Sequence, residues 1–217
     1  MIPLFHDFTD ETVLVLGGGT VGARKARRFA REARTVVVSP AFADADFGDA
    51  ELVRTEPTPA DVGEFVADLA PALVVAATDD GAVNAAAESA AREAGALVNR
   101  ADRAGERDAG SVVVPATVED DPVTVAVATG GTAPALSRHL RERIEAEFPD
   151  VGAMAELAGE IRSELAAAEV PATARHEAVR AVVESSDVWK ALQDGVANGR
   201  QEANRVMQEE TREVLDD

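Results

Sequence analysis

The sequence contains no cysteine, and it contains no apolar run of the about 18 residues that a membrane span requires. Without cysteine, disulfide bonds, thiolate metal sites and cysteine nucleophiles are excluded. The first residues carry neither a basic flank nor a long apolar stretch, so we expect no signal peptide. The expected location of the protein is therefore the cytoplasm.

Basic side chains are also scarce, because only 21 lysines and arginines accompany 40 acidic residues and leave a formal net charge of −19. A surface of this sign repels nucleic acids and anionic membranes, so we expect neither as a partner. The only lysines are Lys25 and Lys190. Excess carboxylate with few lysines is typical of proteins from salt-accumulating cells, where salt screens the repulsion between like charges. We expect a halophilic source, with an acidic protein from a GC-rich genome as the alternative.

Short apolar runs alternate with helical segments through the first hundred residues. The total of 217 residues fits one domain or two small ones. Continuous apolar runs of this kind are typical of strands buried on both faces. Strands are predicted at 12–16, 35–39, 52–55, 73–77 and 97–99, and helices at 23–31, 61–69 and 82–94. This alternation predicts an α/β fold with a Rossmann-type parallel sheet and right-handed crossovers.

The pattern changes after residue 110, where β-hairpin and then helical signals replace the alternation. Two β-type runs at 111–118 and 122–128 predict a hairpin with its turn at 119–121. Helices are predicted at 135–148, 151–168, 171–193 and 198–215. We therefore expect a dinucleotide-binding domain over 1–110, a hairpin-and-helix segment over 111–147 and a C-terminal helical domain over 148–217.

A glycine-rich motif joins the first predicted strand to the first predicted helix. Its spacing allows a tight turn, a close approach of the backbone to a pyrophosphate, and close packing of helix on strand. The free N–H groups of the helix N-terminus then face the phosphates. The predicted cofactor contacts here are Gly17, Gly18, Gly19, Thr20, Val21 and Gly22. The alternative is a tight turn in an α/β fold that binds no nucleotide.

The second predicted strand ends at Ser39 and Pro40, which we expect beside the cofactor's ribose. An acidic residue usually occupies this place in NAD-binding proteins, and none is present. No arginine follows at once to hold a 2′-phosphate. The sequence therefore favours NAD over NADP.

Two later loops carry candidate ligand-binding groups. In the loop Thr129–Pro134, Thr132 suits a helix N-cap, Pro134 suits the first helical turn, and Gly130 and Gly131 let backbone N–H groups converge on an anion. A plain strand-to-helix turn is the alternative.

Asp102 follows the fifth predicted strand, at the edge where parallel sheets bind ligands, and could act as a general base. Arg100 and Arg103 flank it, and a solvated loop with weak ion pairs is the alternative. The histidines His6, His139 and His176 lack neighbours at metal-ligand spacing, so no metal site is predicted.

Taken together, these motifs resemble the precorrin-2 dehydrogenase family, meaning the N-terminal module of siroheme synthase and its stand-alone relatives. The matching segments follow the family's order over about residues 1–147. They are Ile2–Phe5, Gly17–Ala26, Val38–Pro40, Ala76–Asp80 with Asn84, Asn99 with Asp102, Ser111 with Pro115 and Ala116, and Thr129–Pro134.

The resemblance implies NAD-dependent oxidation of precorrin-2 to sirohydrochlorin in siroheme or haem biosynthesis. Some family members also insert Fe²⁺ as sirohydrochlorin ferrochelatases. It also implies a homodimer formed through residues 111–147. Ala128 occupies the place of a serine in many synthase-type relatives, so regulation by modification of that serine is not expected.

The resemblance also implies roles for individual residues. Asp102 is the catalytic carboxylate that accepts a proton as the hydride leaves. Thr78 and Asp79 join the cofactor contacts. The tetrapyrrole substrate is expected to contact Asn99, Arg100, Ser111, Thr129, Gly130, Gly131 and Thr132. Because the substrate is itself an anion, a local basic pocket is needed, for which Arg100, Arg103, Arg107 and Arg138 are candidates.

Two other functions remain open from the sequence. A Rossmann domain joined to a second domain could be a nucleotide-sensing regulatory module. The other alternative is a chelatase without dehydrogenase activity. A nucleotide titration that shows no NAD binding, together with insertion of Fe²⁺ or Co²⁺, would support it.

Overall fold

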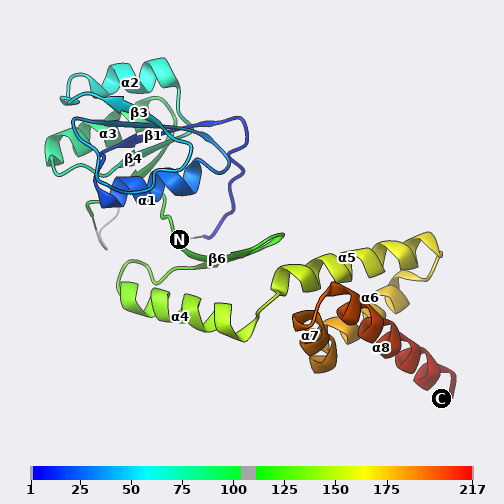
Figure 1. The fold of residues 1–217 in the computed structure, drawn as a ribbon. Helices are drawn as coiled ribbons and strands as arrows, with labels where there is room; N and C mark the ends of the chain where they lie inside the picture. Colours follow the sequence, from blue (N-terminus) through cyan, green and yellow to red (C-terminus); the bar gives the residue numbers. More distant parts are fainter. Residues whose placement is uncertain (1, 104–110, 217) are drawn as a thin grey trace. The chain divides into compact units, whose positions relative to one another are not determined.

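The computed structural model describes residues 2–103 and 111–216, with side chains described as far as residue 209. The chain divides into two compact units, Met1–Val114 and Pro115–Asp217. Figure 1 shows the elements of each unit.

The first unit is built on a five-stranded parallel sheet with the order β3-β2-β1-β4-β5. Its strands are β1 Thr12–Leu16, β2 Arg34–Ser39, β3 Glu51–Arg54, β4 Leu73–Ala76 and β5 Leu97–Arg100. Every neighbouring pair in the sheet is parallel. The predicted Rossmann-type sheet is therefore confirmed, and all five strands lie where the apolar runs placed them.

Helices cover both faces of this sheet, which explains why its central strands are apolar throughout (Figure 1). Helix α1 (Thr20–Phe29) packs on one face through Ala23, Ala26 and Phe29. Helices α2 (Val62–Leu69) and α3 (Gly81–Glu93) pack on the other. Val13 to Leu16 are completely buried between the two layers.

The segment 111–114 belongs to the first unit, although the sequence placed it in a hairpin strand. Ser111 forms a parallel bridge with Val98, and the N–H of Val112 donates to the Val98 carbonyl at 2.8 Å. Val112 and Val114 pack against the core under α1. The single predicted strand 111–118 is wrong because its first half finds apolar partners beside β5.

The second unit begins with an antiparallel hairpin of β6 (Ala116–Asp120) and β7 (Val123–Val127). The hairpin is confirmed, and its turn lies at Asp121–Pro122 because β6 continues through Asp120. Helix α4 (Pro134–Glu147) follows.

Four helices complete the second unit: α5 Val151–Ala167, α6 Ala172–Glu184, α7 Ser186–Gln193 and α8 Val196–Asp216. The sequence predicted one helix over 171–193, and the structure breaks it at Ser185. The Ser185 hydroxyl accepts a hydrogen bond from the Val188 N–H and so caps α7. Val182 and Leu192 are buried in the helical core, and Trp189 packs against it. No helix in the described part of the chain is long and apolar enough to cross a membrane.

Candidate dinucleotide and catalytic site

The glycine turn that joins β1 to α1 has no room for side chains at three of its glycines, Gly17, Gly18 and Gly22. Gly17 has φ +114°, and a Cβ there would lie 2.4 Å from the Ala77 carbonyl oxygen. A Cβ on Gly22 would lie 1.9 Å from the Gly17 carbonyl oxygen. Gly19, by contrast, has open space where its Cβ would be. The turn is therefore tight at its base and open on the side where the N-terminus of α1 offers free N–H groups.

The loop after β2 packs closely against this turn. A Cβ on Gly18 would lie 2.3 Å from the Ala41 carbonyl oxygen, and the Ala43 N–H donates to the Gly18 carbonyl. The Ser39 hydroxyl is buried and donates to the Ala41 carbonyl at 2.8 Å. Pro40 is exposed. The structure thus brings Ser39 and Pro40, the residues predicted to lie near a ribose, next to the glycine turn.

Arg54 also reaches this loop, and the sequence analysis missed it. Its Nη1 donates to the Pro40 carbonyl at 3.2 Å, and its guanidinium lies over the Phe42 ring at 5.3 Å. The residue comes from β3, where it pairs in register with Ser39. Arg54 is distant in sequence from the end of β2, but as the last residue of the neighbouring strand it occupies the same edge of the sheet.

The loop after β4 is fixed by one buried amide. Asn84 is 1% exposed, and its Oδ1 accepts hydrogen bonds from the N–H and the hydroxyl of Thr78 at 3.2 and 2.8 Å. Its Nδ2 donates to the Thr78 carbonyl at 2.8 Å. The Asp80 carboxylate accepts from the N–H groups of Ala82 and Val83, which starts α3. Asp79 lies exposed between these anchors.

Asn99, near the end of β5, carries an unsatisfied acceptor. Its Nδ2 donates to the Val112 carbonyl at 2.8 Å. Its Oδ1 is buried without a hydrogen-bond partner, alone among the described side chains in this respect. A buried acceptor of this kind is satisfied when a ligand brings a donor. Together with the open glycine turn, this observation fits a bound dinucleotide or substrate at the sheet edge.

Asp102 follows β5 by two residues and is bound by Arg100. The Arg100 Nε and Nη2 donate to the two Asp102 oxygens at 2.8 and 2.6 Å. These hydrogen bonds are the main reason that the pKa of Asp102 is lowered, and they also raise the pKa of Arg100. The Asp102 side chain is 26% exposed. It is therefore an ionised carboxylate that a ligand can reach.

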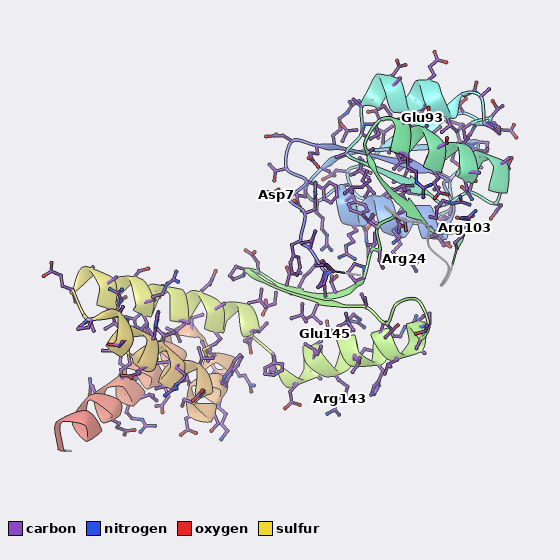
Figure 2. All side chains as sticks on the ribbon, turned by 180° about the vertical axis from the view of Figure 1, so that it is seen from behind. Asp7, Arg24, Glu93, Arg103, Arg143 and Glu145 are labelled. Carbon is purple, nitrogen blue, oxygen red and sulfur yellow. The ribbon has the colours of Figure 1, made fainter. Side chains whose placement is uncertain are left out.

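The residues around Asp102 extend the network into α3. The Glu88 side chain is 9% exposed, and its Oε2 lies 2.8 Å from Nη1 of Arg100. The same oxygen lies 3.9 Å from Nη1 of Arg103, which is labelled in Figure 2. The sequence analysis did not single out Glu88, because a glutamate in an alanine-rich helix has no motif around it.

The loop Thr129–Thr132 lies in the second unit and is held by its own hydroxyl groups. Gly130 and Gly131 have φ +63° and +84°. The Thr129 hydroxyl donates to the Ala133 carbonyl, and the Thr132 hydroxyl donates to the Thr129 carbonyl. The prediction that Thr132 caps α4 is wrong. The loop continues for one residue beyond Thr132, so Ala133 is the N-cap residue and the helix starts at Pro134.

The remaining candidates differ in their placement. Arg138 and His139 are exposed on α4, and Arg107 lies outside the described residues. His6 is within hydrogen-bonding distance of Glu11. Among the described side chains, those of residues 2–103 and 111–209, there is no group of three His, Asp or Glu that could hold a metal ion.

The first unit thus gathers the glycine turn, Ser39, Thr78, Asn99 and Asp102 along one edge of a parallel sheet, which defines a Rossmann dinucleotide-binding domain. Family models agree: the "Putative NAD(P)-binding" model matches residues 4–116, and the "Sirohaem biosynthesis protein central" model matches residues 120–147. The precorrin-2 dehydrogenase of Methanosarcina barkeri is 30% identical over 213 residues, which cover 95% of this chain and 93% of that protein. The chain belongs to the precorrin-2 dehydrogenase family.

Further relatives are longer proteins. Siroheme synthase 1 of Aeromonas salmonicida is 34% identical over 219 residues, covering 97% of this chain and 45% of the relative. The siroheme synthase of Methylococcus capsulatus is 36% identical over 213 residues, which cover 96% of this chain and 43% of that protein. The chain therefore spans less than half the length of these synthases. The solved structure of SirC, a precorrin-2 dehydrogenase, matches 96% of this chain and all of that one with a TM-score of 0.64 at 19% identity, which supports the fold.

Proposed function

We propose that this protein is an NAD-dependent dehydrogenase that oxidises precorrin-2 to sirohydrochlorin in siroheme or haem biosynthesis. The observation that carries the proposal is the end-to-end similarity to a precorrin-2 dehydrogenase, 93% of which is covered. The ionised Asp102 at the ligand-binding edge of an NAD(P)-binding domain supports it.

The coenzyme supplies the hydride acceptor when bound, and the protein binds and orients it. The backbone from Gly17 to Gly22 and the N-terminus of α1 would hold the pyrophosphate. Ser39 and Pro40 would lie at the ribose, and Thr78 and Asp79 would line the next loop. Arg54 places a cation near the ribose end. The absence of a ribose-binding acid therefore does not by itself decide between NAD and NADP, and NAD is proposed from the family.

The substrate carries many carboxylates, whereas the protein has a net charge of −19. Local cations and N–H groups must therefore reverse the sign of the field where the substrate binds. Arg103 is 46% exposed and is one such cation beside Asp102. Asn99, Ser111 and the loop Thr129–Thr132 are proposed as further substrate contacts.

A turnover assay tests the function. Purified protein with precorrin-2 and NAD⁺ is expected to form NADH and sirohydrochlorin in equal amounts, at low salt and in molar KCl. Parallel reactions with NADP⁺ measure the coenzyme preference, and sirohydrochlorin with Fe²⁺ tests chelation separately. No NADH formation at any salt concentration would contradict the proposal. Faster turnover in KCl is expected if the acidic surface is an adaptation to salt.

We also propose a homodimer formed through residues 111–147. Within the fully described helix α4, no side chain is buried in the single chain, and Leu136 and Leu140 are 47% and 39% exposed. An isolated two-stranded hairpin is marginally stable, so β6 and β7 also gain from a partner. Figure 2 shows charged Arg143 and Glu145 on the same helix.

Replacing Leu136 and Leu140 together by glutamate is expected to convert the dimer to a monomer, because like charges would enter an apolar contact. Light scattering after size-exclusion chromatography measures the mass. Val183→Glu with Val196→Glu is the matched control, since both side chains are exposed on other helices and the dimer should persist. A monomeric wild-type protein, or a dimeric Leu136 and Leu140 variant, would contradict the proposed interface.

A further inference from the structure

Both oxygens of the Asp102 carboxylate are bound by a single guanidinium. Arg100 donates from Nε to Oδ1 at 2.8 Å and from Nη2 to Oδ2 at 2.6 Å. A bidentate arginine pair of this kind fixes the orientation of the carboxylate as well as its distance. The Arg100 side chain is only 7% exposed, so water screens the pair weakly. Asp102 therefore has one defined position in the site.

Glu88 holds Arg100 from the other side. The third donor, Nη1 of Arg100, binds Glu88 Oε2 at 2.8 Å, and the other Glu88 oxygen accepts from Arg92 at 2.7 Å. Glu88 comes from α3 and Arg100 from β5, so the ion pair connects two elements of the fold. With partners at Nε, Nη1 and Nη2, the guanidinium cannot rotate without losing charged hydrogen bonds in a buried place. Because all three of its nitrogens already bind these two carboxylates, Arg100 has little capacity to bind a substrate carboxylate as well.

The oxidation places a positive charge on the substrate. Oxidation of precorrin-2 breaks a C–H bond and removes the hydrogen with its electron pair, as a hydride that the nicotinamide coenzyme would accept when bound. The macrocycle, now oxidised by two electrons, is positively charged until it releases a proton to water. An ionised carboxylate held beside it stabilises that charge as it develops. A carboxylate tied to an arginine suits this role better than that of a general base, whose pKa ideally lies near the working pH.

Resting on the proposed function, we propose that Arg100, anchored by Glu88, is a positioning residue that holds Asp102 as a fixed, ionised counter-charge to the macrocycle. This role replaces the direct substrate contact that the resemblance implied for Arg100. In this role Asp102 stays ionised throughout, and the proton of the oxidised macrocycle is released to water.

Two variants test the proposal through the pH dependence of turnover. Arg100→Gln removes the guanidinium, and Glu88→Gln with Arg100→Gln removes both charges, so that no unpaired Glu88 carboxylate stays buried. In both, the acidic limb of the kcat/KM profile is expected to move upward by about one pH unit, because Asp102 loses its cation and protonates more easily. At neutral pH, kcat is expected to fall about tenfold as the carboxylate loses its orientation. Arg34→Gln is the control: it breaks an exposed ion pair with Glu51 at the amino end of β2, and the profile should not move.

A second readout does not depend on activity. The Asp102 carboxyl carbon is titrated by NMR, assigned with Asp102→Asn, and its pKa is expected to rise in both variants. If the wild-type protein shows no turnover, the proposed function fails, while this titration still decides whether Arg100 holds Asp102 ionised. If the wild-type protein is active and both variants keep its pH profile, Arg100 is not a positioning residue and the proposal is overturned. An unchanged titration in both variants overturns it as well.

Discussion

Asp102→Asn is expected to lower kcat by about 10³-fold, because the charge that stabilises the oxidised macrocycle is removed from a fixed place beside it. Asparagine keeps the shape of the side chain and can still accept from Arg100, and the buried pair of Arg100 with Glu88 is left intact. The dissociation constant for NAD⁺ should therefore change less than about twofold. Stopped-flow turnover and calorimetric titration with NAD⁺ measure the two quantities.

The matched control is Asp68→Asn, which removes an equal charge from an exposed position of α2 in the same unit. Turnover of this variant should equal that of the wild-type protein. Full activity of Asp102→Asn would remove Asp102 from the mechanism. A large loss of NAD⁺ binding would instead assign Asp102 to the coenzyme.

Gly22→Ala is expected to weaken coenzyme binding and to destabilise the first unit. Its new methyl group would lie 1.9 Å from the Gly17 carbonyl oxygen, a backbone atom that cannot rotate away. Overpacking of this kind costs about 1–3 kcal/mol, which corresponds to a fall in Tm of several degrees in a domain of about 100 residues. Since the displaced turn is the one that binds the pyrophosphate, the Kd for NAD⁺ should rise more than about tenfold.

Two other glycines separate the effect on folding from the effect on binding. A Cβ on Gly19 meets no atom within 4 Å, so Gly19→Ala should keep its Tm while weakening NAD⁺ binding, because the methyl group occupies the side open to the coenzyme. Gly63→Ala, which is also uncrowded and lies on α2 away from the turn, should change neither quantity adversely. Calorimetry on the three variants measures Tm and Kd. Equal behaviour of Gly22→Ala and Gly63→Ala would show that the close approach at Gly22 is not needed.

The sequence predicted the features that depend on local patterns. Continuous apolar strands and the spacing of Gly17, Gly19 and Gly22 follow directly from burial on two faces and from the geometry of one turn, so the sheet and the dinucleotide-binding fold could be predicted. The family assignment, made from motifs spread over about residues 1–147, is confirmed by the matched models and relatives.

The features that the sequence could not predict depend on partners far away in the chain. Glu88 becomes part of the site only because α3 packs beside the end of β5, and Arg54 only because β3 pairs with β2 in register. The break at Ser185 was missed because a serine inside a helical pattern looks like any exposed position. For Glu88 and Arg54 a tertiary contact, absent from the local pattern, decides the outcome, whereas the cap at Ser185 is a hydrogen bond from Val188 three residues on.

The packing of Val112 and Val114 also decides where this dinucleotide-binding unit can be cut from its neighbour. A border drawn at residue 110 would remove two apolar side chains from the core and the hydrogen bond from Val112 to Val98. A border after Val114 keeps both and coincides with the boundary between the two compact units. A dinucleotide-binding domain that is to be moved to another protein should therefore end at Val114. Pro115 is then the position at which the next segment is joined.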